Sequence, residues 1–260
     1  MDFHKIVSTA VQNSSIADDD KDFYIQGFQY FIELGVQPFE DARKIPAGRS
    51  LFCGRPHLPD NIAWPAGYYF YAQLNCADLK LIDHLKYLPD TGVLYLFLDP
   101  MANDYRPVSK KAAKAFYYEG DTKELKLSAL PLKSSFSDKG KYYYKDLAKS
   151  SSLMTYKPAF TFSAKPPDDL VNSLESTLGF QWINETNCSI FGKPQTWNGE
   201  DEDILFAPSG WDWKKGSPKP SHLIMLYQDV FGEGNLHFWI DKEKLLNKNF
   251  DEIFVTGSVS

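Results

Sequence analysis

The sequence predicts an α+β fold in which two N-terminal helices precede an internally duplicated, mainly antiparallel sheet with short covering helices. Three observations support this prediction. Apolar residues recur at helical spacing up to residue 34. From Ser50 onward, short apolar runs alternate with Pro and Gly, which is typical of strands and turns. Two later stretches also present the same motifs in the same order, which favours a repeated unit.

The N-terminal region contains two apolar patterns with the spacing of an amphipathic helix. The first pattern consists of Phe3, Ile6, Val7, Ala10 and Val11. The second consists of Phe23, Ile25, Phe28, Phe31, Ile32 and Leu34. Gly35 follows directly, at a position where glycine commonly ends a helix. We therefore expect the chain to open with two helices.

Three apolar runs in the next part predict strands, and they lie at Leu51–Cys53, Tyr68–Leu74 and Val93–Leu98. Between the second and third runs, a stripe at every third position predicts a helix over Asp78–Leu88 that lies on the sheet. The stripe is formed by Leu79, Ile82, Leu85 and Leu88.

The later part of the chain carries further local signals. Residues 116–121 and 124–127 resemble a solvated hairpin with a Gly-containing turn. Asp168–Leu178 is preceded by two prolines and followed by Gly179, which predicts a helix with defined ends. A short helix is expected at Lys242–Lys248 and a final strand at Ile253–Thr256.

A comparison of the chain with itself predicts a duplication. Gly92–Asp99 aligns without gaps on Gly234–Asp241. Upstream of each lies an apolar run with one glutamine, Gln73 in the first and Gln228 in the second. Still further upstream, Leu51–Pro56 resembles Ile190–Pro194. The same order occurs twice, which favours a duplicated α+β unit.

These signals divide the chain into a helical segment at 1–49 and a duplicated domain at 50–260. Within the domain, repeat one covers about 50–100, a basic connecting segment about 101–165 and repeat two about 186–256. At this length the repeats can share one continuous core.

Composition and charge limit the classes of function. The 260 residues include 43% hydrophobic and 24% charged residues, which is ordinary for a globular protein and excludes collagen-like and disordered chains. No apolar run approaches the roughly 20 residues that span a bilayer. The start of the chain lacks a basic segment followed by an apolar core, so we expect no secretion signal and a cytoplasmic location. The three cysteines include no CxxC pair and predict neither disulfides nor a cysteine metal site.

The charge is distributed unevenly. The formal net charge is −6, yet residues 106–149 carry 11 Lys/Arg against 5 Asp/Glu. Lysines interleaved with tyrosines in this segment could suit nucleic acid. We regard a solvated hairpin as the better interpretation and do not expect nucleic-acid binding. The acidic cluster formed by Glu200, Asp201, Glu202 and Asp203 would instead attract a basic protein surface.

Four motifs carry a resemblance to the YwqG-like family. They are Gly54–Pro59, Trp64-Pro65, Phe70–Leu79 and Leu88–Phe97, and a late segment covering Gly234–Ile240, Leu245 and Phe250–Val255 is also similar. Cys53-Gly54 and Gly192–Gln195 depart from the family pattern. The resemblance implies an internally repeated, soluble bacterial-type α+β domain of unsettled biochemical function. Members often occur near polymorphic toxin and secretion-system genes, which implies an immunity or accessory role.

Polar and aromatic side chains in the two repeats are the candidate binding residues. They are Arg55, His57, Trp64, Gln73, Trp197, Trp211, Trp213 and Gln228. An amide inside an apolar strand costs about 1–3 kcal/mol if it is buried without partners, so each glutamine needs one. Each glutamine either pins a neighbouring Pro-rich loop through backbone bonds or orients a ligand in a cleft between the repeats. Loop tryptophans also anchor protein interfaces.

The sequence contains no local signature of catalysis. It has no Gly-x-Ser-x-Gly elbow, and the five histidines never form His-x-x-x-His. We therefore expect no catalytic residue, no metal site and no cofactor. The main hypothesis is a non-enzymatic, protein-binding immunity protein that occludes a basic toxin effector. The alternative is a small-molecule binder or hydrolase that uses a cleft between the two repeats.

Overall fold

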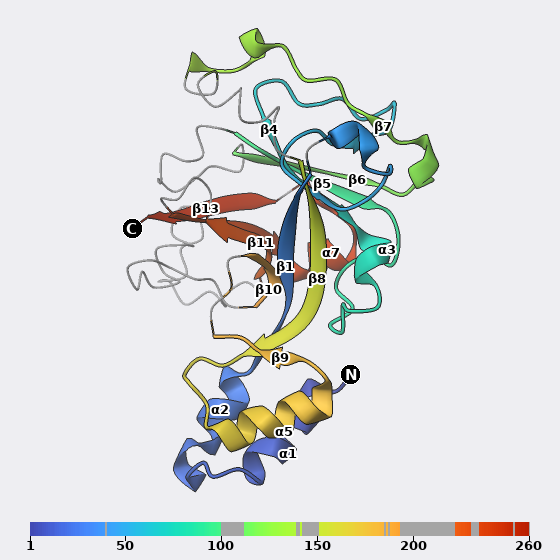
Figure 1. Cartoon of the computed structure of the whole chain (residues 1–260). Coiled ribbons are helices and arrows are strands. Elements are labelled where there is room, and N and C mark those ends of the chain that lie inside the picture. Colours follow the sequence, from blue (N-terminus) through green and yellow to red (C-terminus); the bar gives the residue numbers. More distant parts are fainter. Residues whose placement is uncertain are drawn as a thin grey trace.

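The structure is a computed structural model with a curled, mainly antiparallel sheet and a group of helices that lies together at one end of it (Figure 1). It describes residues 1–39, 41–99, 112–138, 141, 151–184, 186, 188–192, 222–229, 234–251 and 253–259. The predicted α+β class is confirmed. In these residues, the main sheet has eleven strands in the order β13-β12-β11-β10-β1-β8-β2-β4-β5-β6, with β9 parallel to β8.

The strands have the following bounds: β1 Gln29–Phe39, β2 Leu51–Phe52, β3 His57–Leu58, β4 Tyr69–Asn75, β5 Val93–Leu98, β6 Ala113–Tyr118, β7 Lys126–Leu127, β8 Ser151–Thr161, β9 Gln181–Trp182, β10 Cys188–Phe191, β11 His222–Asp229, β12 Gly234–Asp241 and β13 Phe254–Val259. The α-helices are α1 Phe3–Gln12, α2 Lys21–Gly27, α3 Cys76–Leu79, α5 Asp168–Leu178 and α7 Lys242–Leu246. Short 3₁₀ turns lie at η1 Asp18–Asp20, η2 Ala42–Lys44, η4 Thr122–Glu124 and η5 Lys133–Ser135.

Two long strands, β1 and β8, form the centre of the sheet. They pair antiparallel along their whole length, from Gln29 opposite Thr161 to Phe39 opposite Ser151. Gly35 lies opposite Thr155 at the midpoint, and a Cβ atom at Gly35 would lie 2.5 Å from the Thr155 hydroxyl oxygen. The absence of a side chain at Gly35 therefore leaves room for Thr155.

The strand order is balanced about this central pair. On the β8 side follow β2, β4, β5 and β6, and on the β1 side follow β10, β11, β12 and β13. Gly92–Asp99 and Gly234–Asp241, which align in sequence, contain β5 and β12, each next to an edge strand. The ladder is irregular at comparable points, between Phe70 and Ala72 in β4 and between Ile224 and Tyr227 in β11.

The second N-terminal helix is shorter than the predicted helix. α2 ends at Gly27, and residues 29–34 begin the central strand β1, so the prediction of helix is wrong for those residues. The apolar run from Phe28 to Leu34 fits a buried strand as well as a helix, and pairing with β8 decides between them. Residues 1–49 are therefore not a purely helical segment. α1 packs against α2 and α5 at one end of β1 and β8 (Figure 1).

Two other local predictions need correction. α3 covers only Cys76–Leu79, because the Asp83 carboxylate accepts the Leu88 N–H at 2.7 Å and holds the following residues in turns. Residues 116–127 do not form a hairpin, because β6 pairs with β5 and β7 pairs with β3. The predicted connecting segment 101–165 consequently contains the edge strand β6 and the central strand β8.

The predicted helix at Asp168–Leu178 is confirmed, including its end at Gly179, which adopts a φ of 73°. This helix buries Leu170, Leu174 and Leu178 against the sheet and α1. Its ends are fixed by local sequence, because the two prolines favour the first turn and glycine tolerates the left-handed backbone.

Buried apolar side chains form two clusters on opposite faces of the sheet. The larger includes Leu94 and Leu96 together with the three buried leucines of α5. The smaller includes Phe70, Tyr95 and Phe97. None of the helices in the described ranges combines the length and the apolar character needed to cross a membrane.

Candidate functional site

Gln73 is a fully buried polar residue in the otherwise apolar strand β4. Its carbonyl oxygen accepts the His57 backbone N–H at 2.8 Å, and its amide nitrogen donates to the Arg49 carbonyl at 2.7 Å. One side chain therefore ties two loops to the sheet. These two bonds agree with the loop-pinning interpretation of Gln73.

His57 is held from its other side by Tyr95 of β5. The Tyr95 hydroxyl donates to the His57 carbonyl oxygen at 2.8 Å. The imidazole is buried, and its Nδ1 atom has no hydrogen-bond partner among the described residues. Burial lowers the pKa of His57, and the positive charge of Arg55 lowers it further. The ring is therefore neutral near pH 7.

Arg55 and Trp64 also bind the main chain of neighbouring loops. The Arg55 guanidinium donates to the Ser128 carbonyl oxygen at 2.8 Å, beside the short β3–β7 sheet. The Trp64 indole N–H donates to the Tyr68 carbonyl oxygen at 2.8 Å, and its ring contacts Phe70 and Phe97. Both side chains therefore stabilise loops that surround the smaller core.

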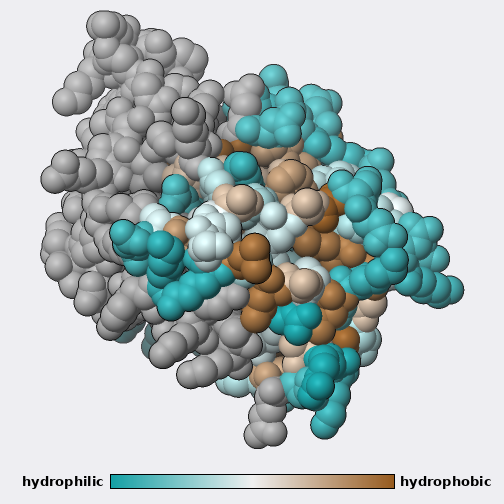
Figure 2. Space-filling view, turned by 90° about the horizontal axis from the view of Figure 1, so that it is seen from above, coloured by the Kyte–Doolittle hydropathy of each residue, from teal (hydrophilic) through white to brown (hydrophobic). Residues whose placement is uncertain are grey.

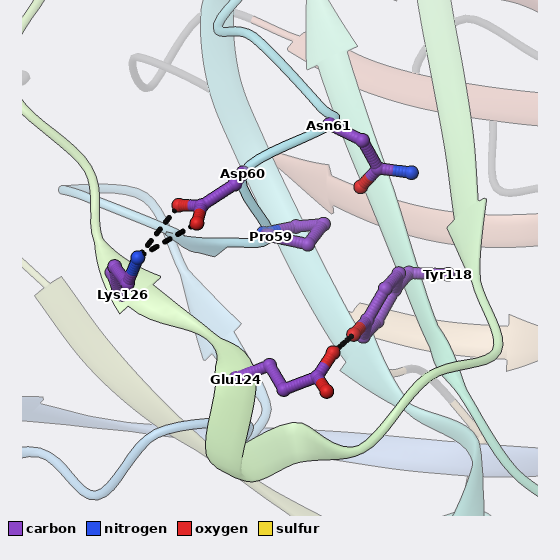
Figure 3. Close-up of a pocket in the computed structure, with 6 residues that line it drawn as sticks. All are labelled: Pro59, Asp60, Asn61, Tyr118, Glu124 and Lys126. Atoms are coloured by element: carbon purple, nitrogen blue, oxygen red, sulfur yellow. Dashed lines mark hydrogen bonds and ion pairs between the residues drawn. The ribbon is translucent and has the colours of Figure 1, made fainter.

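These anchored loops place Asp60 and Asn61 over the edge strand β6. Together with residues of β6, η4 and β7 they enclose a surface hollow of about 460 Å³ (Figure 3). Its lining consists of Pro59, Asp60, Asn61, Tyr118, Glu124 and Lys126. The hollow is open to solvent, and charged and hydrogen-bonding groups lie beside apolar surface in its lining.

The polar groups of the hollow bind one another in two pairs (Figure 3). The Lys126 ammonium lies 2.8 Å from an Asp60 carboxylate oxygen, and the Tyr118 hydroxyl donates to Glu124 at 2.6 Å. The bond to Glu124 raises the pKa of Tyr118 to about 12, because ionisation would set two negative charges side by side. The Lys126 and Asp60 side chains are 69% and 81% exposed, so water screens this ion pair.

A second hollow of about 520 Å³ continues along β6 and shares Asn61 and Tyr118 with the first. Its far wall is formed by Lys248, Phe250 and Asp251, which follow α7. Lys248 pairs with Glu119, lies over the Tyr117 ring and so joins this wall to the end of β6. We refer to the two hollows together as the β6 groove.

Among the candidate residues of the first repeat, His57 and Gln73 are buried, whereas Arg55 and Trp64 are partly exposed. The His57 N–H donates to Gln73, Arg55 donates to Ser128, and Trp64 packs on the smaller core cluster. The expected cleft between the two repeats stays a prediction, because Trp197, Trp211, Trp213 and the side chain of Gln228 lie outside the described residues. Cys53, half-buried beside them, has its pKa raised to about 12 by burial and is a poor nucleophile.

Gln73 and Gln228 do not hold equivalent positions in the sheet. Gln73 pairs with Tyr95 of β5, whereas Tyr227, not Gln228, pairs with His237, the β12 residue that aligns with Tyr95. Gln228 pairs with Leu236, which aligns with Leu94, the partner of Leu74. Gln228 therefore corresponds to Leu74 and not to Gln73. The side chain of Gln228 lies outside the described residues, as do Trp197, Glu200, Asp201, Glu202, Asp203, Trp211 and Trp213.

The groove residues were not predicted from the sequence. Pro59-Asp60-Asn61 is a recognisable turn signal, but Lys126, the partner of Asp60, is 66 residues away. Glu124 and Lys126 lie in the segment interpreted as a solvated hairpin. The available signal was only that this segment mixes charges with tyrosines.

The described residues contain no group of three or more His, Cys, Asp or Glu side chains placed to hold a metal ion.

On the face seen from above, hydrophobic residues lie close together near the middle and hydrophilic residues form much of the border (Figure 2). A hydrophilic border around hydrophobic surface resembles the polar rim of a protein interface.

A family model described as a domain of unknown function (DUF1963) matches residues 50–257. No curated protein matches the chain.

Proposed function

Because the chain belongs to the DUF1963 family, whose function is unknown, we propose a function from the site itself: binding of another protein at the β6 groove. The protein acts without chemistry of its own, as an immunity protein that occludes a basic toxin effector in the cytoplasm. The resemblance to the YwqG-like family and its toxin-associated gene neighbourhoods agrees with this role by analogy.

The charge arrangement of the groove is the observation that carries the proposal. Two lysines are each paired with a carboxylate, Lys126 with Asp60 and Lys248 with Glu119. Glu124 and Asp251 also line the groove and have no cation as partner in the described part of the chain. The groove therefore has an excess of negative charge on an exposed rim. Such rims steer encounter with a basic partner and favour specificity.

The rigid backing of the groove supports recognition in the same way. Gln73 and Tyr95 fix the loop that carries Asp60 and Asn61, so little conformational freedom is lost when a partner binds. Preorganised loops bind more tightly, because the entropic cost of ordering has already been met in folding.

The balanced strand order supports a further part of the proposal, that the sheet arose by internal duplication. One unit runs from β1 to β6 and the other from β8 to β13, so each begins with a long central strand. β2 pairs with β8 and β10 pairs with β1, which means that the units exchange their first strands. The turns after β2 and β10 also agree, since Cys53-Gly54 and Phe191-Gly192 all have positive φ.

The experiment that tests the function is a binding screen against the products of the genes adjacent to the one encoding this chain. Co-expression should restore growth when one product is toxic, and the two proteins should purify together. Asp251→Lys and Glu124→Lys should weaken this complex together by about tenfold or more, because they reverse the charge of the rim. A complex that is indifferent to both substitutions, or a toxic product that is degraded rather than bound, would refute the proposal.

A further inference from the structure

β6 is an edge strand whose main-chain groups alternate between two directions. The Asp99 N–H donates to the Ala112 carbonyl at 2.7 Å, which makes this a hydrogen-bonded pair of the β5–β6 register. Hydrogen-bonded pairs recur at every second residue of an antiparallel ladder. Lys114, Phe116 and Tyr118 therefore bond to β5, and the N–H and C=O groups of Ala113, Ala115 and Tyr117 are directed away from it.

The β6 groove lies along this outer edge. Its second hollow is lined from Ala115 to Gly120, which includes residues from both faces of the strand. Ile62 flanks it on the side of the smaller core, and Phe250 flanks it on the side of the larger core. A hollow that contacts both faces of an edge strand borders the edge itself.

No ladder joins β6 to a strand other than β5 among the described residues. β13, at the opposite end of the sheet, contacts β6 without a ladder between them, and Ala113 and Ala115 are buried. An added strand therefore replaces contacts that β6 makes with β13. An edge with unpaired main-chain groups is a template for a further strand. Addition of an extended peptide to such an edge is a recurring mode of recognition.

We propose that an extended basic segment of a partner protein adds to β6 as a further antiparallel or parallel strand. The segment bonds to the main chain of Ala115 and Tyr117, and its side chains alternate between the apolar wall at Phe250 and the acidic rim. This proposal rests on the proposed function, for which it supplies the mode of binding.

The charge of the groove favours a basic occupant over a second copy of this chain. Its lining contains the carboxylates of Asp60, Glu119, Glu124 and Asp251 against the ammonium groups of Lys126 and Lys248. Two such grooves placed edge to edge would bring like charge together, which is unfavourable. A strand with lysine or arginine at alternate positions would instead balance the excess.

The test uses a peptide of about eight alternating Lys and Val residues as the probe, with the whole chain labelled for amide exchange. Two matched peptides serve as controls, one with Glu in place of Lys and one N-methylated at alternate residues so that it cannot donate to an edge. The Lys/Val peptide should bind and slow exchange of the Ala115 and Tyr117 amides, while those of Lys114 and Phe116, already bonded to β5, stay unchanged. Both control peptides should bind at least about tenfold more weakly.

The protein variant Ala115→Pro provides the second arm, because proline lacks the outward N–H and leaves the bonds of Lys114 and Phe116 to β5 in place. Binding of the Lys/Val peptide should fall by about tenfold or more while thermal unfolding stays cooperative. The N-methylated peptide tests the same contact on the unaltered chain, so the result does not depend on the folding of this variant.

Several outcomes overturn the proposal. They are no detectable binding of the Lys/Val peptide, equal binding of the N-methylated peptide, and a concentration-dependent dimer that Ala115→Pro abolishes, which would assign the edge to self-pairing. If an adjacent gene product binds the chain while the Ala115 and Tyr117 amides exchange unchanged, strand addition fails and the protein-binding function stands. If the peptide adds to the edge and no gene product binds, strand addition stands and the protein-binding function fails.

Discussion

Gln73 carries an unusual share of the local order for one side chain. Its two bonds join β4 to the loop before β2 and to β3, and both bonds go to main-chain atoms. A polar side chain inside a dry cluster is costly unless both ends are bonded, and here both are. The loop that forms one side of the β6 groove therefore depends on this residue.

Gln73→Leu should lower the free energy of unfolding by about 2–3 kcal/mol, because it leaves the buried His57 N–H without its acceptor. Urea denaturation measures this change. The matched control is Gln37→Leu in β1, the same replacement at an exposed strand position, which should change stability by less than about 0.5 kcal/mol. Equal effects of the two substitutions would show that Gln73 does not pin the loops.

His57 should make stability depend on pH. Its folded pKa is lowered, so below the unfolded pKa of about 6.5 the unfolded chain binds more protons and stability falls with falling pH. In His57→Gln this contribution is absent, and the loss of stability between about pH 7 and pH 5 should be shallower by up to about 1.4 kcal/mol per pH unit. Urea midpoints at both pH values measure it, and identical pH slopes for the two proteins would contradict the account.

The turn after β2 shows how an element depends on one backbone position. Gly54 has a φ of 77°, and a Cβ atom there would lie 2.7 Å from the Ser151 Cα of β8. Gly192 occupies the corresponding turn after β10, with a φ of 86° and a Cβ contact of 2.9 Å to Phe31 of β1. Each short strand is therefore packed against a long central strand with no space for a side chain.

Gly54→Ala should be more destabilising than Gly179→Ala by about 2 kcal/mol. Both glycines have positive φ, but a Cβ atom at Gly179 meets nothing within 4 Å, so Gly179→Ala incurs only the backbone strain, about 1 kcal/mol. Thermal unfolding of the two variants distinguishes backbone strain, which both share, from the steric clash with Ser151, which only Gly54→Ala makes. A difference smaller than about 0.5 kcal/mol would mean that β8 moves away from the turn without cost.

Elements with strong local signals could be predicted from the sequence, whereas those decided by distant pairing could not. Asp168–Leu178 has its prolines, its apolar face and its glycine within one short segment, and the predicted bounds are confirmed. β1 was mistaken for helix because its apolar residues fit both periods and its partner, β8, lies more than a hundred residues later. The groove was missed for the same reason, since Asp60 and Lys126 meet only in the fold.

At the scale of the whole molecule, the family match and the folding unit begin at different residues. The match starts at residue 50, yet β1 at Gln29–Phe39 lies between β10 and β8 at the centre of the sheet. Without β1, two strands would lose their partner along a central edge and the larger core would be opened. The matched segment is therefore not expected to fold by itself.

A chain that begins at residue 50 should show no cooperative thermal transition and should aggregate, because its sheet is divided. A chain that begins at residue 28 retains β1 and serves as the control. It should unfold cooperatively at a reduced Tm, since it lacks α1 and α2 but keeps the complete sheet. Calorimetry distinguishes them, and cooperative unfolding of the shorter chain would refute the central role of β1.

The central claim is that this fold presents the edge of β6, beside a loop fixed by Gln73, as a surface for a basic protein segment. Hydrogen–deuterium exchange of the full chain, with and without the gene product that it captures, tests this claim most directly. Slower exchange should appear in peptides covering residues 113–120 and 58–62, which flank the groove. Protection confined to other parts of the chain, with residues 113–120 unaffected, would contradict it.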